Sequence, residues 1–297
     1  MKRRIYKIGL VLIVLIIAAL AFVVHNVLPY ALLQPQRVTT TNYLETENQN
    51  YTALQLVTKD SVTLKGYHVK SNKDTVYGSI VLIHGIGGCK EHFTELAIDL
   101  ANSGYDSWLF DNRAHGESGG EYSTYGYHEK NDISLIIDTI KENQPTSKIG
   151  IWGNSLGGAI ALQAIEKDKR IAFGIIESTF TDLNQIVYDY QKRFSYGIGL
   201  EWICDIALNK ASKIGAFNSE DVKPIESVKN ISCPVLIAHG NADGNIKFEY
   251  GKQLYTNLAS KDKVFVEVDN ADHYNMYDAG GEEYSTKLFN FLKRQTH

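Results

Sequence analysis

From residue 51 onward, short apolar runs alternate with longer stretches in which apolar residues recur every three or four positions. A bounded apolar run is typical of a buried strand, and the longer spacing is typical of an amphipathic helix. The strand-type segments are SIVLIHG at 79–85, DSWLF at 106–110, KIGIWG at 148–153, AFGIIES at 172–178, CPVLIAHG at 233–240 and KVFVEVD at 263–269. Helix-type segments lie at 92–104, 129–143, 156–168, 247–260 and 282–294. Such alternation predicts an α/β fold with a mostly parallel sheet and helices on both of its faces.

Two further strands are predicted ahead of this series. The segment from Ala53 to Val69 has two alternating apolar and polar runs on either side of Lys59 and Asp60. This pattern indicates a β-hairpin, which would add an antiparallel edge to the sheet. With the six buried-type strands, the hairpin brings the predicted sheet to eight strands.

The N-terminal region has a different pattern. Four basic residues among the first seven precede an uncharged, apolar run from Ile8 to Val24. A helix of about 17 residues is roughly 25 Å long, close to the thickness of a hydrocarbon core. Basic residues before the run, and none soon after it, predict a single-pass membrane anchor with a cytoplasmic N-terminus and an extracytoplasmic domain. The alternative is a signal peptide cleaved near Ala19-Leu20-Ala21, which would leave a secreted protein, although the run is longer than the usual h-region.

These patterns divide the chain into three parts. Residues 1–30 form the basic tip and the transmembrane anchor, the polar residues 31–50 are interpreted as a tether, and residues 51–297 form the main domain. Within that domain, the interval 181–230 is far longer than a typical connection between a strand and a helix. It contains several aromatic residues at helical spacing, and we interpret it as a small helical cap inserted over the carboxyl edge of the sheet. A single long crossover helix with a surface loop is the alternative.

Composition and charge exclude several classes of protein. The 297 residues are 44% hydrophobic and 22% charged, which is ordinary for a globular enzyme and argues against disorder. The net charge of −4, without a basic run after the N-terminus, argues against a nucleic-acid partner. The three cysteines, Cys89, Cys204 and Cys233, lack both the spacing of a zinc site and the number of a disulfide framework. We expect no metal and no organic cofactor.

The motif GNSLG, from Gly153 to Gly157, gives the first candidate for chemistry. It directly follows one predicted strand and directly precedes a predicted helix, which is the setting of a nucleophile elbow. A sharp turn would hold Ser155 in a strained conformation above the sheet, and the glycines would remove clashes with the crossing chain. The N–H of Leu156 would lie at the helix N-terminus, where an anion is favoured.

Four motifs together carry a resemblance to a known family. They are HGIGG at 84–88, DNRAHGESGG at 111–120, GNSLGG at 153–158 and HGNAD at 239–243. In this order, the chain from about residue 51 to its end resembles the α/β-hydrolase superfamily, in particular its bacterial serine-hydrolase branch of esterases, lipases and acyl-peptidases with a modest cap. The resemblance implies the α/β-hydrolase fold, here preceded by one transmembrane helix.

The resemblance also implies a catalytic triad in the chain order serine, acid, histidine. Asp243, in the loop after the strand at 233–240, matches the acid, and His273, after the strand at 263–269, matches the histidine. His273 would take the proton of Ser155, and Asp243 would orient and stabilise the imidazole. The other carboxylates that could serve as the acid are Glu177, Asp269 and Asp272.

An oxyanion hole needs a second backbone donor besides Leu156. By resemblance, that donor is the N–H of Ile86 in the loop after the strand at 79–85. Cys89 lies close by, but no base is paired with it in the sequence, so we interpret it as a small loop residue. The DNRAHGES segment corresponds to a structural turn in the family.

The sequence therefore predicts a membrane-anchored serine hydrolase that cleaves a carboxylic ester or a related acyl bond through an acyl-Ser155 intermediate. Its expected substrates are small esters, lipid-like molecules or short acyl-peptides. Alternatives are a serine peptidase or an acyltransferase with the same three residues, and a non-catalytic anchored binding module.

Overall fold

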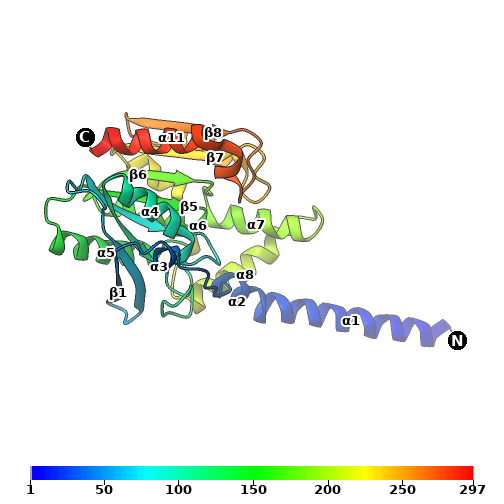
Figure 1. Ribbon diagram of the computed structural model, residues 1–297. Helices are drawn as coiled ribbons and strands as arrows, with labels where there is room; N and C mark the ends of the chain where they lie inside the picture. The colour runs from blue at the N-terminus through cyan, green and yellow to red at the C-terminus, as the bar shows by residue number, and fades with distance from the viewer. Residues whose placement is uncertain (1, 297) are drawn as a thin grey trace.

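A single twisted sheet organises the chain in the computed structural model, which describes residues 2–296 (Figure 1). Its eight strands have the order β1-β2-β4-β3-β5-β6-β7-β8. Strand β2 pairs antiparallel with both β1 and β4, and all other neighbouring strands are parallel. The strands are β1 (Tyr51–Val57), β2 (Thr63–Val69), β3 (Gly78–Ile83), β4 (Tyr105–Phe110), β5 (Ile149–Asn154), β6 (Ile171–Glu177), β7 (Val235–Gly240) and β8 (Lys263–Val268). The predicted α/β-hydrolase fold, with its antiparallel hairpin at one edge, is confirmed.

Helices cover both faces of the sheet because the central strands are apolar on both sides. In β3, Val81 and Ile83 join one hydrophobic cluster and Ile80 and Leu82 join the other, as the alternation of side chains along a strand requires. The first cluster contains residues of α5 (Glu129–Asn143), α6 (Leu156–Lys167) and α10 (Phe248–Asn257). The second contains residues of α4 (Thr94–Asn102) and α11 (Met276–Thr296). This double cover leaves the ends of the strands as the place for a site.

The interval between β6 and β7, interpreted above as a cap, contains several separate helices. Helices α7 (Leu183–Phe194) and α8 (Glu201–Ile214) are followed by the short helices η2 (Ser219–Asp221), α9 (Pro224–Ser227) and η3 (Val228–Asn230). Asp182 caps the N-terminus of α7: its carboxylate accepts the N–H of Gln185 at 3.1 Å and so satisfies a free donor of the first turn. In Figure 1, α7 projects beyond the sheet on the side where α1 leaves the domain.

Helix α1 (Lys2–Asn26) extends away from the domain and is followed directly by α2 (Leu28–Leu33) (Figure 1). The helical stretch Arg3–Leu33 contains an 18-residue window with a mean hydropathy of 3.0 and is long enough to cross a membrane. Most side chains of α1 are exposed, so the domain does not shield this helix from its surroundings. Burial begins at the C-terminal end of α1, where Val24 is 3% exposed.

The segment 31–50, interpreted from its composition as a tether, is attached to the domain at several points. Leu33 and Leu44, the latter in α3 (Tyr43–Thr46), are completely buried. The carbonyl of Leu33 accepts the N–H of Ser123 at 2.8 Å. The guanidinium of Arg37 donates to backbone carbonyls of the 115–120 loop, among them that of Gly120 at 2.7 Å. Single apolar and basic residues thus fix this segment to the domain, although no periodic pattern marks them in the sequence.

Candidate active site

Ser155 occupies a sharp turn between β5 and α6. Its backbone has φ 53° and ψ −120°, a conformation that residues with a side chain rarely adopt. Holding such a residue costs on the order of 1–3 kcal/mol, which the surrounding structure must offset. The N–H of Ser155 donates to the carbonyl of Glu177 at 2.8 Å, and its carbonyl accepts the hydroxyl of Thr179 at 2.7 Å. These bonds to the end of β6 help to fix the turn.

The two glycines of the motif are required by contact with the neighbouring backbone. A Cβ at Gly153 would lie 2.3 Å from the carbonyl oxygen of Gly157. A Cβ at Gly157 would lie 2.0 Å from the carbonyl oxygen of Ile83, at the end of β3. Both distances are far below van der Waals contact, so the G-x-S-x-G spacing follows from the packing of this turn.

Ser155, His273 and Asp243 form one hydrogen-bonded chain. The Nε2 atom of His273 is 3.0 Å from Ser155 Oγ, and Nδ1 is 2.8 Å from Asp243 Oδ2. An ionised carboxylate can only accept, so the imidazole carries its proton on Nδ1 and leaves Nε2 free to accept the serine proton. This arrangement has the geometry of a nucleophile, a general base and a group that orients the base.

The carboxylate of Asp243 is buried and has a full set of donors. Its Oδ1 atom accepts the backbone N–H groups of Asn245 and Ile246, each at 2.8 Å. Burial alone would raise the pKa of Asp243, but hydrogen bonds from His239 and His273 and from the backbone hold it well below its usual range. The carboxylate therefore stays ionised at neutral pH, and its negative charge would stabilise a positive charge on the neighbouring imidazole.

The other candidate carboxylates have different partners. Glu177 is buried, where it accepts Trp152 Nε1 at 2.7 Å and the hydroxyl of Tyr284. Asp272 accepts backbone N–H groups of its own loop, and Asp269 accepts the side-chain amide of Asn241. Within the described residues 2–296, Asp243 is hydrogen-bonded to His273, and the hydrogen bonds of the other three carboxylates go to other groups.

The expected oxyanion donors, Leu156 and Ile86, belong to two segments that lie next to the serine. Leu156 is the first residue of α6, so its N–H has no acceptor within the helix. A Cβ at Gly85 would be 3.2 Å from Ser155 Cβ, which places the loop of Ile86 directly beside the nucleophile. Ile86 itself is 46% exposed. The N–H groups of these two residues remain the expected donors to an anion that develops during acyl transfer.

Sequence reasoning missed the buried lysine that anchors this loop. Lys90, at the start of η1 (Lys90–Phe93), is 1% exposed, and its Nζ lies 3.0 Å from Asp111 and 2.7 Å from Glu117. The N–H of Asn112 donates to Nε2 of His84 at 3.0 Å. Burial lowers the pKa of His84 to about 3, so that ring is neutral and able to accept. The DNRAHGES segment thus supports the loop of Ile86, as a structural turn would.

Cys89, in the same loop, is buried. Burial raises the pKa of its thiol to about 11, so the thiol stays protonated at neutral pH. This agrees with the interpretation of Cys89 as a small loop residue.

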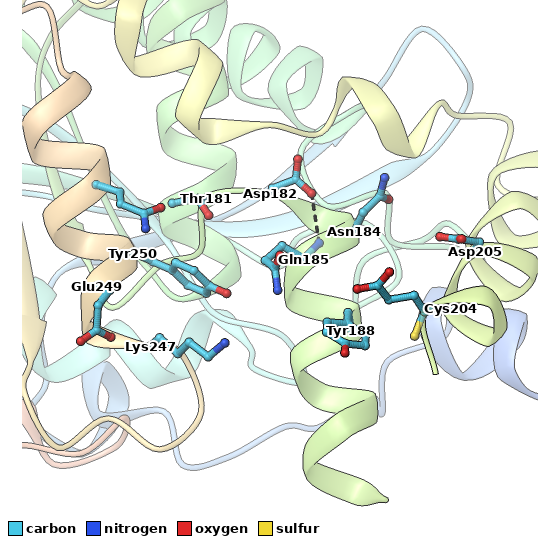
Figure 2. A pocket seen from close by; sticks show the side chains of 12 residues that line it. Thr181, Asp182, Asn184, Gln185, Tyr188, Cys204, Asp205, Lys247, Glu249 and Tyr250 are labelled. Carbon is cyan, nitrogen blue, oxygen red and sulfur yellow. Dashed lines mark hydrogen bonds between the residues drawn. The ribbon is translucent and has the colours of Figure 1, made fainter. Parts of the chain in front are cut away.

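An apolar groove of about 670 Å³ opens at Ser155. Its walls come from α7, α8 and, unexpectedly, from α1 and α2. A larger cleft of about 800 Å³ lies between α7, α8 and α10, but polar and charged groups such as Asp182, Asp205 and Lys247 line it (Figure 2). Because Ser155 lines the apolar groove and not the polar cleft, the groove is the candidate binding site.

The sequence is similar to those of several known proteins. The sequence model of the family described as serine aminopeptidase, S33, matches residues 74–199. Uncharacterized protein YqkD of Bacillus subtilis (strain 168) is 26% identical over 254 residues, covering 83% of this chain and 80% of that protein. Lysophosphatidylserine lipase ABHD12 of Rattus norvegicus is 30% identical over 194 residues, which span 63% of this chain but only 46% of the lipase.

Solved structures agree with these similarities. The Pyrococcus furiosus esterase Pf2001 superposes with a TM-score of 0.74 at 25% identity, covering 90% of this chain and 99% of the esterase. An acylaminoacyl peptidase of Pyrococcus horikoshii, 17% identical with a TM-score of 0.64, shares the fold over 87% of this chain and 44% of the peptidase. The sheet order, the turn at Ser155 and these similarities show that the chain belongs to the α/β-hydrolase superfamily.

Proposed function

We propose that this protein is a membrane-anchored serine hydrolase that cleaves carboxylic esters through an acyl-enzyme on Ser155. The observation that carries the proposal is the hydrogen-bonded chain from Asp243 through His273 to Ser155, which ends at the apolar groove. A hydroxyl is a weak nucleophile on its own, and an adjacent base within hydrogen-bond reach activates it.

In the acylation step, Ser155 Oγ attacks the ester carbonyl carbon while His273 Nε2 takes the hydroxyl proton. The N–H groups of Ile86 and Leu156 donate to the negatively charged oxygen of the tetrahedral intermediate. The bond to the alcohol oxygen then breaks, and the imidazolium returns the proton to that leaving oxygen. Asp243 remains ionised throughout and stabilises the imidazolium.

In the deacylation step, a water molecule attacks the acyl carbon and gives a proton to His273. The bond from the acyl carbon to Ser155 Oγ breaks, and His273 returns the proton to the serine. The free acid leaves, and the enzyme is restored. An acyltransferase would use an alcohol or an amine in place of water at this step, so product analysis with added acceptors separates the two activities.

An ester, not a peptide, is favoured as the substrate. The groove beside Ser155 is strongly apolar, which suits an acyl chain better than a peptide backbone with its polar groups. The names of an esterase and of lipases among the similar proteins support the same choice, and the name of the matched family keeps an aminopeptidase as the competing activity.

The location follows from the N-terminal helix. We propose that α1 crosses the cell membrane once, with the basic residues Lys2, Arg3, Arg4 and Lys7 in the cytoplasm and the domain outside. Protease added to intact cells should digest the domain and spare the N-terminal tip. Release of the domain into the medium would instead support the cleaved signal peptide.

The test compares the full chain in detergent with its Ser155→Ala variant and with a Ser134→Ala control on the outer helix α5. We expect the parent and the control to hydrolyse p-nitrophenyl esters and to react with a fluorophosphonate probe, and the Ser155→Ala variant to do neither. Turnover of aminoacyl amides without ester turnover would favour the aminopeptidase. Folded protein with neither activity nor labelling would favour the binding module and refute the proposal.

A further inference from the structure

The N-terminal helices form one wall of the groove that reaches Ser155. The residues on this wall are Leu20, Val23 and Val24 of α1 and Leu28, Ala31 and Leu32 of α2. The facing wall comes from the cap, with Ile186, Val187 and Tyr190 on α7 and Ile203 and Ala207 on α8. A helix with the length of a membrane span therefore also contributes to the binding site.

This wall is held in place by several contacts. The hydroxyl of Tyr125 donates to the carbonyl of Leu32 at 2.6 Å, and Leu33 directly after it is completely buried. Arg37 then ties the chain to the carbonyls of the 115–120 loop. Since Val24 is also buried, the end of α1 is part of the packed structure and does not swing freely beside the groove.

The membrane would reach the mouth of the groove. A hydrocarbon core of about 30 Å takes about 20 helical residues, so a span that begins at Ile8 ends near Val27. Leu20 and Val23, which line the groove, are then at the level of the outer leaflet. The same side chains would contact lipid on one side and the groove on the other.

A second part of the molecule is suited to the membrane surface on the same side. The end of α7, the turn after it and the start of α8 expose Phe194 (75%), Tyr196 (100%), Ile198 and Trp202. In Figure 1 this turn and α1 project from the same side of the sheet. Aromatic side chains are enriched at the interface between membrane and water, and exposed apolar groups of this size mark an interaction surface.

We infer that the groove binds the acyl chain of a lipid ester that enters from the membrane along α1, with the ester carbonyl at Ser155. The inference rests on the proposed ester hydrolysis and names its substrate class. One groove of about 670 Å³ has the size of a site for a single small ligand, and burying each methylene group in it is favourable. The wall from α1 and α2 then acts as a determinant of acyl-chain specificity.

The first experiment uses the full chain in phosphatidylcholine vesicles and p-nitrophenyl esters from acetate to palmitate. Ala31→Trp adds volume at an exposed position of the wall, and Ala21→Trp adds the same volume to α1 away from the groove. We expect Ala31→Trp to lower the ratio of kcat/KM for the palmitate ester to that for the acetate ester about tenfold. This is the effect of roughly two methylene groups of the acyl chain that are no longer buried in the groove. The Ala21→Trp control should keep the parent ratio. An unchanged ratio in Ala31→Trp, or an equal change in both variants, would overturn the inference.

A second experiment reads the position of the chain directly. The full-length Ser155→Ala variant in the same vesicles is mixed with a monoacyl glycerol ester whose chain ends in a diazirine, and then irradiated. Crosslinks to peptides containing residues 20–32 or the facing residues 186–207 are expected, and crosslinks confined to other peptides would refute the inference. Failure of the proposed function would look different, because the parent would then neither hydrolyse the acetate ester nor react with a fluorophosphonate.

Discussion

Replacing Asp243 with asparagine should reverse the tautomer of His273. Oδ1 of Asp243 accepts two backbone N–H groups, whereas Oδ2 faces Nδ1 of His273. In Asp243→Asn the amide oxygen therefore takes the place of Oδ1, and the NH₂ group faces the imidazole. His273 must then accept at Nδ1 and carry its proton on Nε2, so it can no longer accept the proton of Ser155.

The size of the effect follows from this geometry. A histidine in the wrong tautomer cannot act as a general base, which costs about 10⁴-fold in kcat, or about 5 kcal/mol of transition-state stabilisation. Asp243 does not line the apolar groove, so KM should stay within about twofold of the parent value. The amide also keeps the two backbone hydrogen bonds, and we expect the variant to remain folded.

The assay is steady-state hydrolysis of p-nitrophenyl butyrate by the full chain in detergent, together with the rate of fluorophosphonate labelling. Asp272→Asn and Asp269→Asn serve as matched controls, because these carboxylates lie near His273 in sequence but bond elsewhere. Circular dichroism confirms that each variant is folded. The reasoning fails if Asp243→Asn keeps more than about a tenth of the parent kcat, or if a control loses as much activity.

Three further changes test the packing around the site. Gly157→Ala places a Cβ 2.0 Å from the carbonyl oxygen of Ile83. In urea unfolding we expect the free energy of unfolding to fall by about 3 kcal/mol, and an unchanged urea midpoint would contradict this. Lys90→Met leaves the buried Asp111 without its ion pair, so the free energy of unfolding should fall by about 3–5 kcal/mol in the same assay. A fall below about 1 kcal/mol would be evidence against a stabilising role of this ion pair. A hydrogen bond from the buried Arg113 lowers the pKa of Asp60 from 3.8 to about 2. The ionised carboxylate therefore stabilises the folded state above pH 3.8, and this stabilisation is lost as the pH falls through about 2. As the pH is lowered from 3.8 to about 2, the thermal midpoint of Asp60→Asn should fall less than that of the parent. Parallel plots of thermal midpoint against pH would contradict the assignment.

The sequence predicted the strands and the convergence of the three site residues for a simple reason. Ser155, Asp243 and His273 each follow a strand of parallel type, and the carboxyl ends of parallel strands lie at one edge of the sheet. The glycines around Ser155 marked the turn because no other residue fits there. The order of the strands, by contrast, depends on pairing between distant segments, which the apolar pattern does not record.

The wall formed by the N-terminal helices could not be predicted. Every position of α1 from Ile8 to Val24 is apolar or small, so no periodic pattern distinguishes the residues that face the groove from those that face lipid. Leu33 and Leu44 are single apolar residues in a polar stretch, and an isolated leucine does not reveal burial. Lys90 was missed because its charge suggests a surface position, and the partners that allow its burial come from a different segment.

The fixed attachment of residues 31–50 has a consequence for how such an enzyme would meet its substrates. With α1 in a bilayer, Arg37 and the buried leucines hold the nucleophile at a constant height above the membrane. The search for substrate is then confined to two dimensions, within the leaflet next to the domain. The rate of hydrolysis would then depend on the mole fraction of the ester in that surface. Diluting the ester with inert phospholipid would therefore slow turnover even when the total concentration of ester in the sample is constant.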